Sequence, residues 1–222
     1  DTLRGNIGQD TLSGQANADQ LFGGQNEDEV FGGAGFDLVD GGDGADLVDG
    51  GGDNDTVNGG NGDDTVLGVA GSDVLDGGAG NDSLLGGNGF DTIDGGTGLD
   101  TIDGGLGNDL VNAGGANDSV LGNAGSDTIN GDGGADTLEG QGGNDVINGG
   151  NGSDVILGGV NNDTLTGGAG NDTMTGGTGA DGFVFSAIND ADVITDFLVN
   201  VDDLDFSAVA AINSFADCSA AA

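Results

Sequence analysis

The sequence contains no proline, tryptophan, tyrosine or histidine, and Arg4 is its only basic residue. Without proline the chain is neither collagen-like nor a proline-rich linker, although glycine supplies 53 of its 222 residues. The single cysteine, Cys218, has no partner for a disulfide within the chain. We expect it to be an incidental thiol, with an intermolecular link as the alternative. No stretch approaches the ~20 apolar residues of a spanning helix, so no membrane span is predicted.

The shortage of positive charge leaves 40 acidic residues almost unopposed, with a formal net charge of −39. A chain this acidic repels nucleic acid and anionic membrane surfaces, so neither is predicted as a partner. The partners that its charge favours are cations. Composition alone would also fit a disordered, acidic, low-complexity segment.

A strict period of nine residues argues against disorder. Aspartate recurs in one phase from Asp1 to Asp181 without an insertion or deletion, and a large apolar residue stands two positions after each aspartate. Glycine stands five positions before each aspartate, and the only interruption of this glycine series is Ala113. Such regularity is the sequence signature of a repeat architecture.

The repeating unit is G-G-x-G-x-D-x-U-x, where U is a large apolar residue, and clean copies occupy residues 77–85 and 167–175. This pattern resembles the repeat-in-toxin (hemolysin-type) calcium-binding nonapeptide over residues 1–184. The resemblance implies calcium ions shared between stacked turns, with the aspartate of each repeat as a direct ligand. The candidate metal ligands are Asp10, Asp19, Asp28, Asp37, Asp46, Asp55, Asp64, Asp73, Asp82, Asp91, Asp100, Asp109, Asp118, Asp127, Asp136, Asp145, Asp154, Asp163, Asp172 and Asp181.

The residues of the repeat support the same structure on physical grounds. The x-U-x segment predicts a three-residue strand, and the glycine-rich remainder predicts a turn with positive φ angles. Two nonapeptides then complete an 18-residue coil, which predicts an all-β, two-sheet parallel β-roll in which each repeat stacks on the next but one. Stacked aspartates ~4.8 Å apart would repel one another unless a hard cation such as Ca²⁺, which takes 6–8 oxygen ligands, lay between them.

About nineteen such ions, each joining two stacked turns, would bring a charge of about +38 against the −39 of the chain. We therefore expect the chain to be unfolded without calcium and folded with it.

Some turns depart from the glycine pattern. The fourth position of the unit is Asn17, Asn26, Asp53, Ala116 or Asn161 in five repeats. Asparagine and aspartate tolerate the left-handed conformation that glycine adopts in turns. Ala116, and Val69 at the second position of another repeat, tolerate it less well. We expect distorted or weak ion sites beside these two residues.

Residues 185–222 lose the glycine rhythm and are predicted to form a short C-terminal β cap. Apolar segments such as Asp192–Phe197 and Asp203–Ser207 would cover the exposed last coil, which a solenoid needs. These segments look like the region that follows the roll in serralysin-type secreted proteins. That resemblance implies a C-terminal signal for the type I secretion apparatus, and an extracellular or cell-surface location in bacteria. The N-terminus shows no signal-peptide pattern, and Asp1 falls in mid-repeat, which suits a fragment of a longer chain.

No enzyme is predicted. Neither histidine nor lysine is present to activate a serine, and the periodic aspartates are better explained as metal ligands than as a glycosidase pair. The favoured function is that of a structural protein that self-associates into a surface layer or filament. The alternatives are a secretion and folding module of a larger secreted hydrolase or toxin, and an adhesin or ice-binding module suggested by outward threonines such as Thr56 and Thr92.

Overall fold

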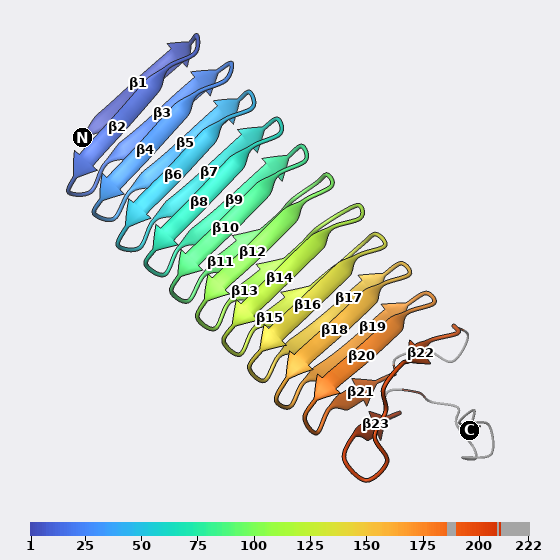
Figure 1. The fold of residues 1–222 in the computed structure, drawn as a ribbon. Helices are drawn as coiled ribbons and strands as arrows, with labels where there is room; N and C mark the ends of the chain where they lie inside the picture. Colours follow the sequence, from blue (N-terminus) through green and yellow to red (C-terminus); the bar gives the residue numbers. More distant parts are fainter. Residues whose placement is uncertain (186–189, 208, 210–222) are drawn as a thin grey trace.

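The structure is a computed structural model that describes residues 1–185, 190–207 and 209. Within these residues the chain winds into a flattened solenoid with a β-sheet on each broad side and a turn at each edge (Figure 1). Odd-numbered strands form a 12-stranded sheet, even-numbered strands form an 11-stranded sheet, and every strand pair is parallel. The predicted two-sheet parallel β-roll is confirmed.

The strands of the odd sheet are β1 (Thr2–Ile7), β3 (Gln20–Gln25), β5 (Leu38–Asp43), β7 (Thr56–Asn61), β9 (Val74–Ala79), β11 (Thr92–Asp94), β13 (Leu110–Asn112), β15 (Thr128–Asn130), β17 (Val146–Asn151), β19 (Thr164–Ala169), β21 (Gly182–Val184) and β23 (Asp203–Asp205). The strands of the even sheet are β2 (Thr11–Ala16), β4 (Glu29–Ala34), β6 (Leu47–Gly52), β8 (Thr65–Ala70), β10 (Ser83–Asn88), β12 (Thr101–Leu106), β14 (Ser119–Ala124), β16 (Thr137–Gly142), β18 (Val155–Val160), β20 (Thr173–Thr178) and β22 (Val193–Ile194).

The register of the sheets follows the repeat. Leu21 pairs with Leu3 on one side and with Val39 on the other, which is a shift of 18 residues at each step. Because every coil has the same length, each repeat lies on the next but one, as the nine-residue period predicts.

Most strands are longer than predicted. The period indicated three residues, but strands such as β3 and β4 have six, and they continue through the glycine pair into the start of the turn. The second glycine of the pair keeps its place in the ladder with a positive φ, as at Gly24 (119°) and Gly42 (109°), which pair with each other. Glycine tolerates this backbone geometry, so the strand and the turn overlap in sequence.

The core is a double column of the U side chains between the two sheets. From Leu21 to Phe183 all of these side chains are at most 1 % exposed, and the residues on either side of each one point away from the core. A burial of this kind is the main favourable term in folding, at about 25 cal/mol per Å² of apolar surface.

Residues that replace glycine in the turns adopt the conformation of glycine. At the fourth position φ is 77° at Asn17, 80° at Asn26, 75° at Asp53, 100° at Ala116 and 78° at Asn161. Val69, at a second position, has φ of 77°. A left-handed backbone is strained for a β-branched residue, so the strain expected at Val69 is present in the backbone.

Two strands beyond the repeats extend the sheets. Strand β22 pairs with β20 and places Ile194 beside Met174, while β23 pairs with β21 and places Leu204 beside Phe183. The predicted division of the chain at residues 184 and 185 stays a prediction. Cys218 and the tail at 216–222 lie outside the described residues. Among the described residues no helix has the length and apolar character needed to cross a bilayer.

Candidate metal centre

The repeat aspartates line both edges of the roll, one at the point where each turn enters a strand. From Asp19 to Asp181 they have only 1–4 % of their surface exposed, while Asp10 in the first coil is half-buried. A buried carboxylate is unfavourable unless hydrogen bonds or an ion of opposite charge compensate it. The surroundings of its two oxygens therefore indicate what the site can hold.

One carboxylate oxygen joins successive coils. Asp28 Oδ1 accepts a hydrogen bond of 2.7 Å from the backbone N–H of Asp10, and Asp46 Oδ1 accepts one of 2.7 Å from Asp28. The same contact recurs along both edges as far as Asp181, whose Oδ1 accepts from Asp163 at 3.0 Å. The predicted stacking of aspartates 18 residues apart is confirmed, and it includes a backbone hydrogen bond that the sequence did not indicate.

The other oxygen, Oδ2, has no hydrogen-bond partner among the described residues in most of the repeats. In 19 repeat aspartates, from Asp10 to Asp172, it is buried and accepts no hydrogen bond. A buried polar atom without a partner is rare in a native protein, and here it recurs in a regular series.

Each Oδ2 lies close against the first glycine of its repeat, and we call the group formed by this glycine, the Oδ2 atom and the backbone oxygen facing them the cradle of that aspartate. A β-carbon at Gly131 would lie 2.6 Å from Asp136 Oδ2 and 2.5 Å from the carbonyl oxygen of Gly149 in the next coil. Any side chain at this position would meet both oxygens. The cradle thus brings a carboxylate oxygen and a backbone carbonyl oxygen close to a residue that, with the exception of Ala113, has no side chain.

These donors fit calcium. Ca²⁺ binds carboxylate and carbonyl oxygens and accepts irregular geometry. Within the described residues, no three acidic, histidine or cysteine side chains gather into a metal-binding cluster. Backbone carbonyls of the glycine-rich turns are therefore the ligands that would have to complete each site around one or two aspartates.

Without an ion, burial raises the pKa of many of the aspartates from Asp46 to Asp181. Burial is the main cause, and it raises the pKa of Asp55, Asp64, Asp127 and Asp163 to about 7. It raises the pKa of Asp91, Asp100 and Asp136 to about 6. In each case the hydrogen bond from the preceding aspartate lowers the pKa, and neighbouring carboxylates raise it further. A bound cation would have the opposite effect because it stabilises the ionised form.

A second ladder runs along the outer side of many turns from Asn54 onward, at the residue just before the repeat aspartate. Asn81 Oδ1 accepts from the N–H of Leu99 at 2.9 Å, and Asn54 Oδ1 accepts from the N–H of Ser72 at 2.9 Å. Sequence reasoning missed this role, although the frequent Asn, Asp and Ser at this position were a signal for it. These side chains satisfy turn N–H groups and hold successive coils together at the edge.

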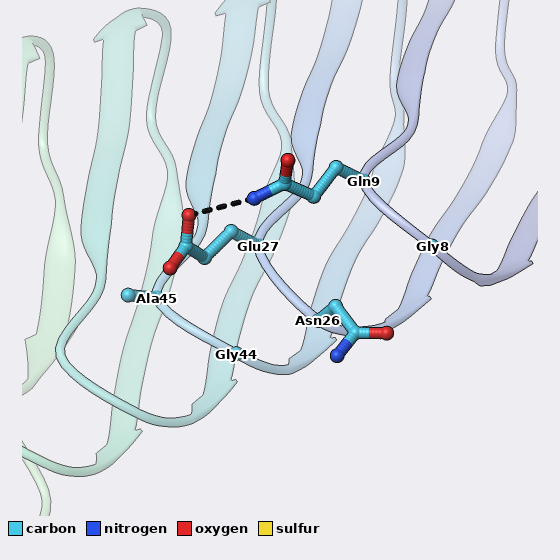
Figure 2. A pocket seen from close by; sticks show the side chains of 6 residues that line it. All are labelled: Gly8, Gln9, Asn26, Glu27, Gly44 and Ala45. Atoms are coloured by element: carbon cyan, nitrogen blue, oxygen red, sulfur yellow. Dashed lines mark hydrogen bonds between the residues drawn. The ribbon is translucent and has the colours of Figure 1, made fainter.

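Figure 2 shows the same column near the N-terminus, where a shallow pocket crosses three stacked turns. Gln9 Nε2 donates to Glu27 Oε2 of the next coil at 2.8 Å, and Ala45 continues the column. Gly44 stacks on Asn26, whose carbonyl oxygen would clash with a β-carbon at Gly44. The close approach of stacked turns therefore requires glycine at many of these fourth positions.

Two aspartates of the C-terminal segment continue the edge columns outside the nine-residue phase. Asp192 Oδ1 accepts from the N–H of Asp172, and Asp202 Oδ1 accepts from the N–H of Asp181, both at 3.1 Å. Their spacings are 20 and 21 residues instead of 18, so the period did not reveal them. The signal available was the D-x-U pattern in Asp192–Ile194 and Asp202–Leu204. Asp202 Oδ2 differs from its counterparts in the repeats, because it accepts from the N–H of Leu198 at 2.7 Å.

Comparison with known families gives one match. The family model for four copies of the RTX calcium-binding nonapeptide repeat matches residues 1–30, 22–57, 58–93, 85–120, 121–156 and 148–183. These segments together span the whole array of repeats. A comparison with curated proteins found no match.

Proposed function

The chain belongs to the family of RTX calcium-binding nonapeptide repeats, and from this premise we propose that it is a secreted structural protein that folds around columns of calcium ions. Binding of multiple calcium ions is the property of the family. The repeats of this family are typically structural rather than catalytic. The proposal adds the ligands, the coupling of binding to folding, the location and the assembly.

The proposed ligands are the repeat aspartates from Asp10 to Asp181, each with backbone carbonyl oxygens of its own turn and of the stacked turn. The observation that carries this assignment is the buried, unpartnered Oδ2 in 19 successive repeats. An ion in each cradle would supply the missing partner and would neutralise the charge that accumulates along each edge.

Folding coupled to calcium follows from the same charges. The chain has a net charge of −39, and its repeat carboxylates are buried in two columns when the coils stack. Without cations, burial of these ionised groups opposes folding, since each would lose its water without gaining a partner of opposite charge.

The experiment is far-UV circular dichroism of the chain in chelator at pH 8, where the repeat aspartates are ionised, followed by titration with calcium and, separately, with magnesium. Magnesium is a suitable control because it demands stricter octahedral geometry and gives up its water reluctantly. A cooperative gain of β-structure with calcium alone supports the proposal. A chain that is fully folded in chelator, or unfolded throughout the titration, refutes the coupling.

Self-association into a layer or filament is supported by ordered apolar side chains on the odd sheet. Val74 is 48 %, Leu110 40 % and Val146 49 % exposed, and they stand on every second strand, β9, β13 and β17. Exposed apolar groups in a regular row can bury one another between copies of the chain. Calcium-dependent particles of fixed width in electron micrographs support assembly, and a monomer at all concentrations under calcium excludes it.

A secretion and folding module of a larger secreted hydrolase or toxin is the second candidate. It is favoured by the C-terminal segment, in which β22 and β23 extend the sheets and Phe185 and Phe206 stack with ring centroids 4.8 Å apart. The mass of the native gene product separates the two. A much larger chain with a histidine-containing N-terminal domain favours the module, and secretion through a type I apparatus is expected in either case.

A further inference from the structure

The glycine that opens each cradle is replaced once in the array. The first position of the unit is glycine from Gly5 to Gly176, and Ala113 is the single exception. Ala113 lies on the inner side of the roll and has no exposed surface. Its methyl group is therefore inside the structure, at the position where every other repeat has only a hydrogen atom.

The neighbouring coils show where this methyl group points. At each of the glycines in this column, a β-carbon would lie less than 3.0 Å from Oδ2 of the aspartate five residues later. For Gly95, in the coil before Ala113, this oxygen is Asp100 Oδ2 at 2.9 Å, and for Gly131, in the coil after it, Asp136 Oδ2 at 2.6 Å. By the same geometry the methyl group of Ala113 lies in the cradle of Asp118.

The backbone does not move away to make room. The Ala113 N–H donates to Asn130 O at 2.8 Å, and the neighbouring Gly95 N–H donates to Asn112 O at 2.9 Å. Asp118 Oδ1 accepts from the N–H of Asp100 at 2.8 Å, as in the other coils. Asp118 therefore stays in its column, and its Oδ2 remains buried without a partner.

The sheet is less regular around this position. Strands β11, β13 and β15 have three residues each, whereas β9 and β17 on either side have six. The three short strands are consecutive in the odd sheet and centre on β13, which ends directly before Ala113. The ladder resumes beyond the interruption with bridges from Thr97 to Gly115 and from Gly115 to Gly133.

We infer that the cradle of Asp118 does not bind calcium, because the Ala113 methyl group lies against the carboxylate and carbonyl oxygens that would have to hold the ion. This inference rests on the proposed function, since it concerns one member of the proposed series of sites. The ion column on this edge is thus divided into a part before Asp118 and a part after it. In a solenoid each coil contacts only its neighbours, so the gap interrupts the chain of stabilising ions locally.

The test compares ion counts in matched variants by native mass spectrometry of the calcium-loaded chain, which resolves single ions. Ala113→Gly opens the cradle and is expected to add one ion. Ala116→Gly, in the same turn, relieves a φ of 100° without touching the cradle and is expected to add none. Gly95→Ala copies the natural replacement one coil earlier and is expected to remove one ion.

A second pair of variants removes the carboxylate itself. Asp100→Asn is expected to lose one ion and to raise the calcium concentration at half-folding, measured by circular dichroism. Asp118→Asn is expected to lose none and to leave that concentration unchanged or lower, since it removes a buried charge that no ion compensates. The Asn side chain keeps an oxygen for the hydrogen bond from Asp100, so the stack is preserved.

An unchanged ion count in Ala113→Gly, or the loss of one ion in Asp118→Asn, would overturn the inference while leaving the proposed function intact. A wild-type chain that binds no calcium would instead refute the proposed function, and the inference with it. The two failures are therefore distinguishable in the same spectra.

Discussion

Protonation of the buried aspartates is expected to replace part of the contribution of calcium to folding. Acidification of the metal-free chain in chelator tests this. Burial raises the pKa of Asp64 and Asp127 to about 7 in the metal-free roll, compared with 3.8 for a free aspartate. The folded state therefore binds more protons than the unfolded state between about pH 4 and pH 7. The stability that these groups contribute is present at low pH and is lost as the pH rises through 7.

The size of the effect follows from the number of such groups. Four aspartates have a pKa of about 7 and three have a pKa of about 6. These seven groups alone should then take up about six protons when the metal-free chain folds at pH 5, which makes the equilibrium steeply dependent on pH. Stabilisation by calcium has the opposite dependence on pH, because calcium binds the ionised carboxylates and should be released as the pH falls.

The assay is circular dichroism in chelator from pH 8 to pH 5, at low protein concentration because the isoelectric point is near 4.1. We expect β-structure to appear below pH 6.5 without any metal. Asp64→Asn serves as the control, since it removes one titrating group and should lower the proton uptake by about one. A chain that stays unfolded down to pH 5 would contradict the view that buried charge is what prevents folding without calcium.

Three further predictions concern the core, the turns and the C-terminal segment. Ile102→Ala removes a fully buried side chain and should lower the free energy of unfolding of the calcium-loaded roll by about 2–5 kcal/mol in denaturant titrations. Thr101→Ala, on the exposed side of the same strand, should change this free energy by less than about 0.5 kcal/mol. Val69→Gly should stabilise the roll by about 1–2 kcal/mol because it relieves a φ of 77°, and the melting temperature should rise; the same change at Asn26, which tolerates this conformation, should have little effect. Asp196→Ala should accelerate amide exchange at the end of β20, because Asp196 Oδ1 and Oδ2 accept the N–H groups of two consecutive glycines at 3.0 and 2.7 Å. Unchanged exchange there would show that other groups protect this end of the sheet.

The nine-residue period was sufficient to predict the coil, the register and the edge that each aspartate occupies. It predicts that Leu21 stacks on Leu3 because the period has no insertion, and the strand pairing agrees. It did not predict six-residue strands, since a glycine with positive φ, such as Gly24, reads as a turn in sequence yet pairs as a strand residue in three dimensions.

The sequence proposes the repeat aspartates as the calcium ligands, and this assignment stays a prediction. The different positions of their two oxygens depend on the stacked geometry and could not be predicted: Oδ1 joins successive coils, and Oδ2 faces the cradle. The role of Asp192 and Asp202 in the edge columns was not predicted, because extra residues precede them and shift them out of the nine-residue phase. Ala113 was visible as an exception, but its meaning depends on the direction of its methyl group, which only the fold defines.

The measurement that tests the central claim most directly is an anomalous difference map from crystals of the calcium-loaded chain. We expect two columns of calcium peaks, one along each edge of the roll, with each peak beside Oδ2 of a repeat aspartate. Peaks confined to acidic residues on the outer faces of the sheets, or a folded roll in which the cradles other than that of Asp118 have no peaks, would contradict the assignment of the repeat aspartates as the calcium ligands.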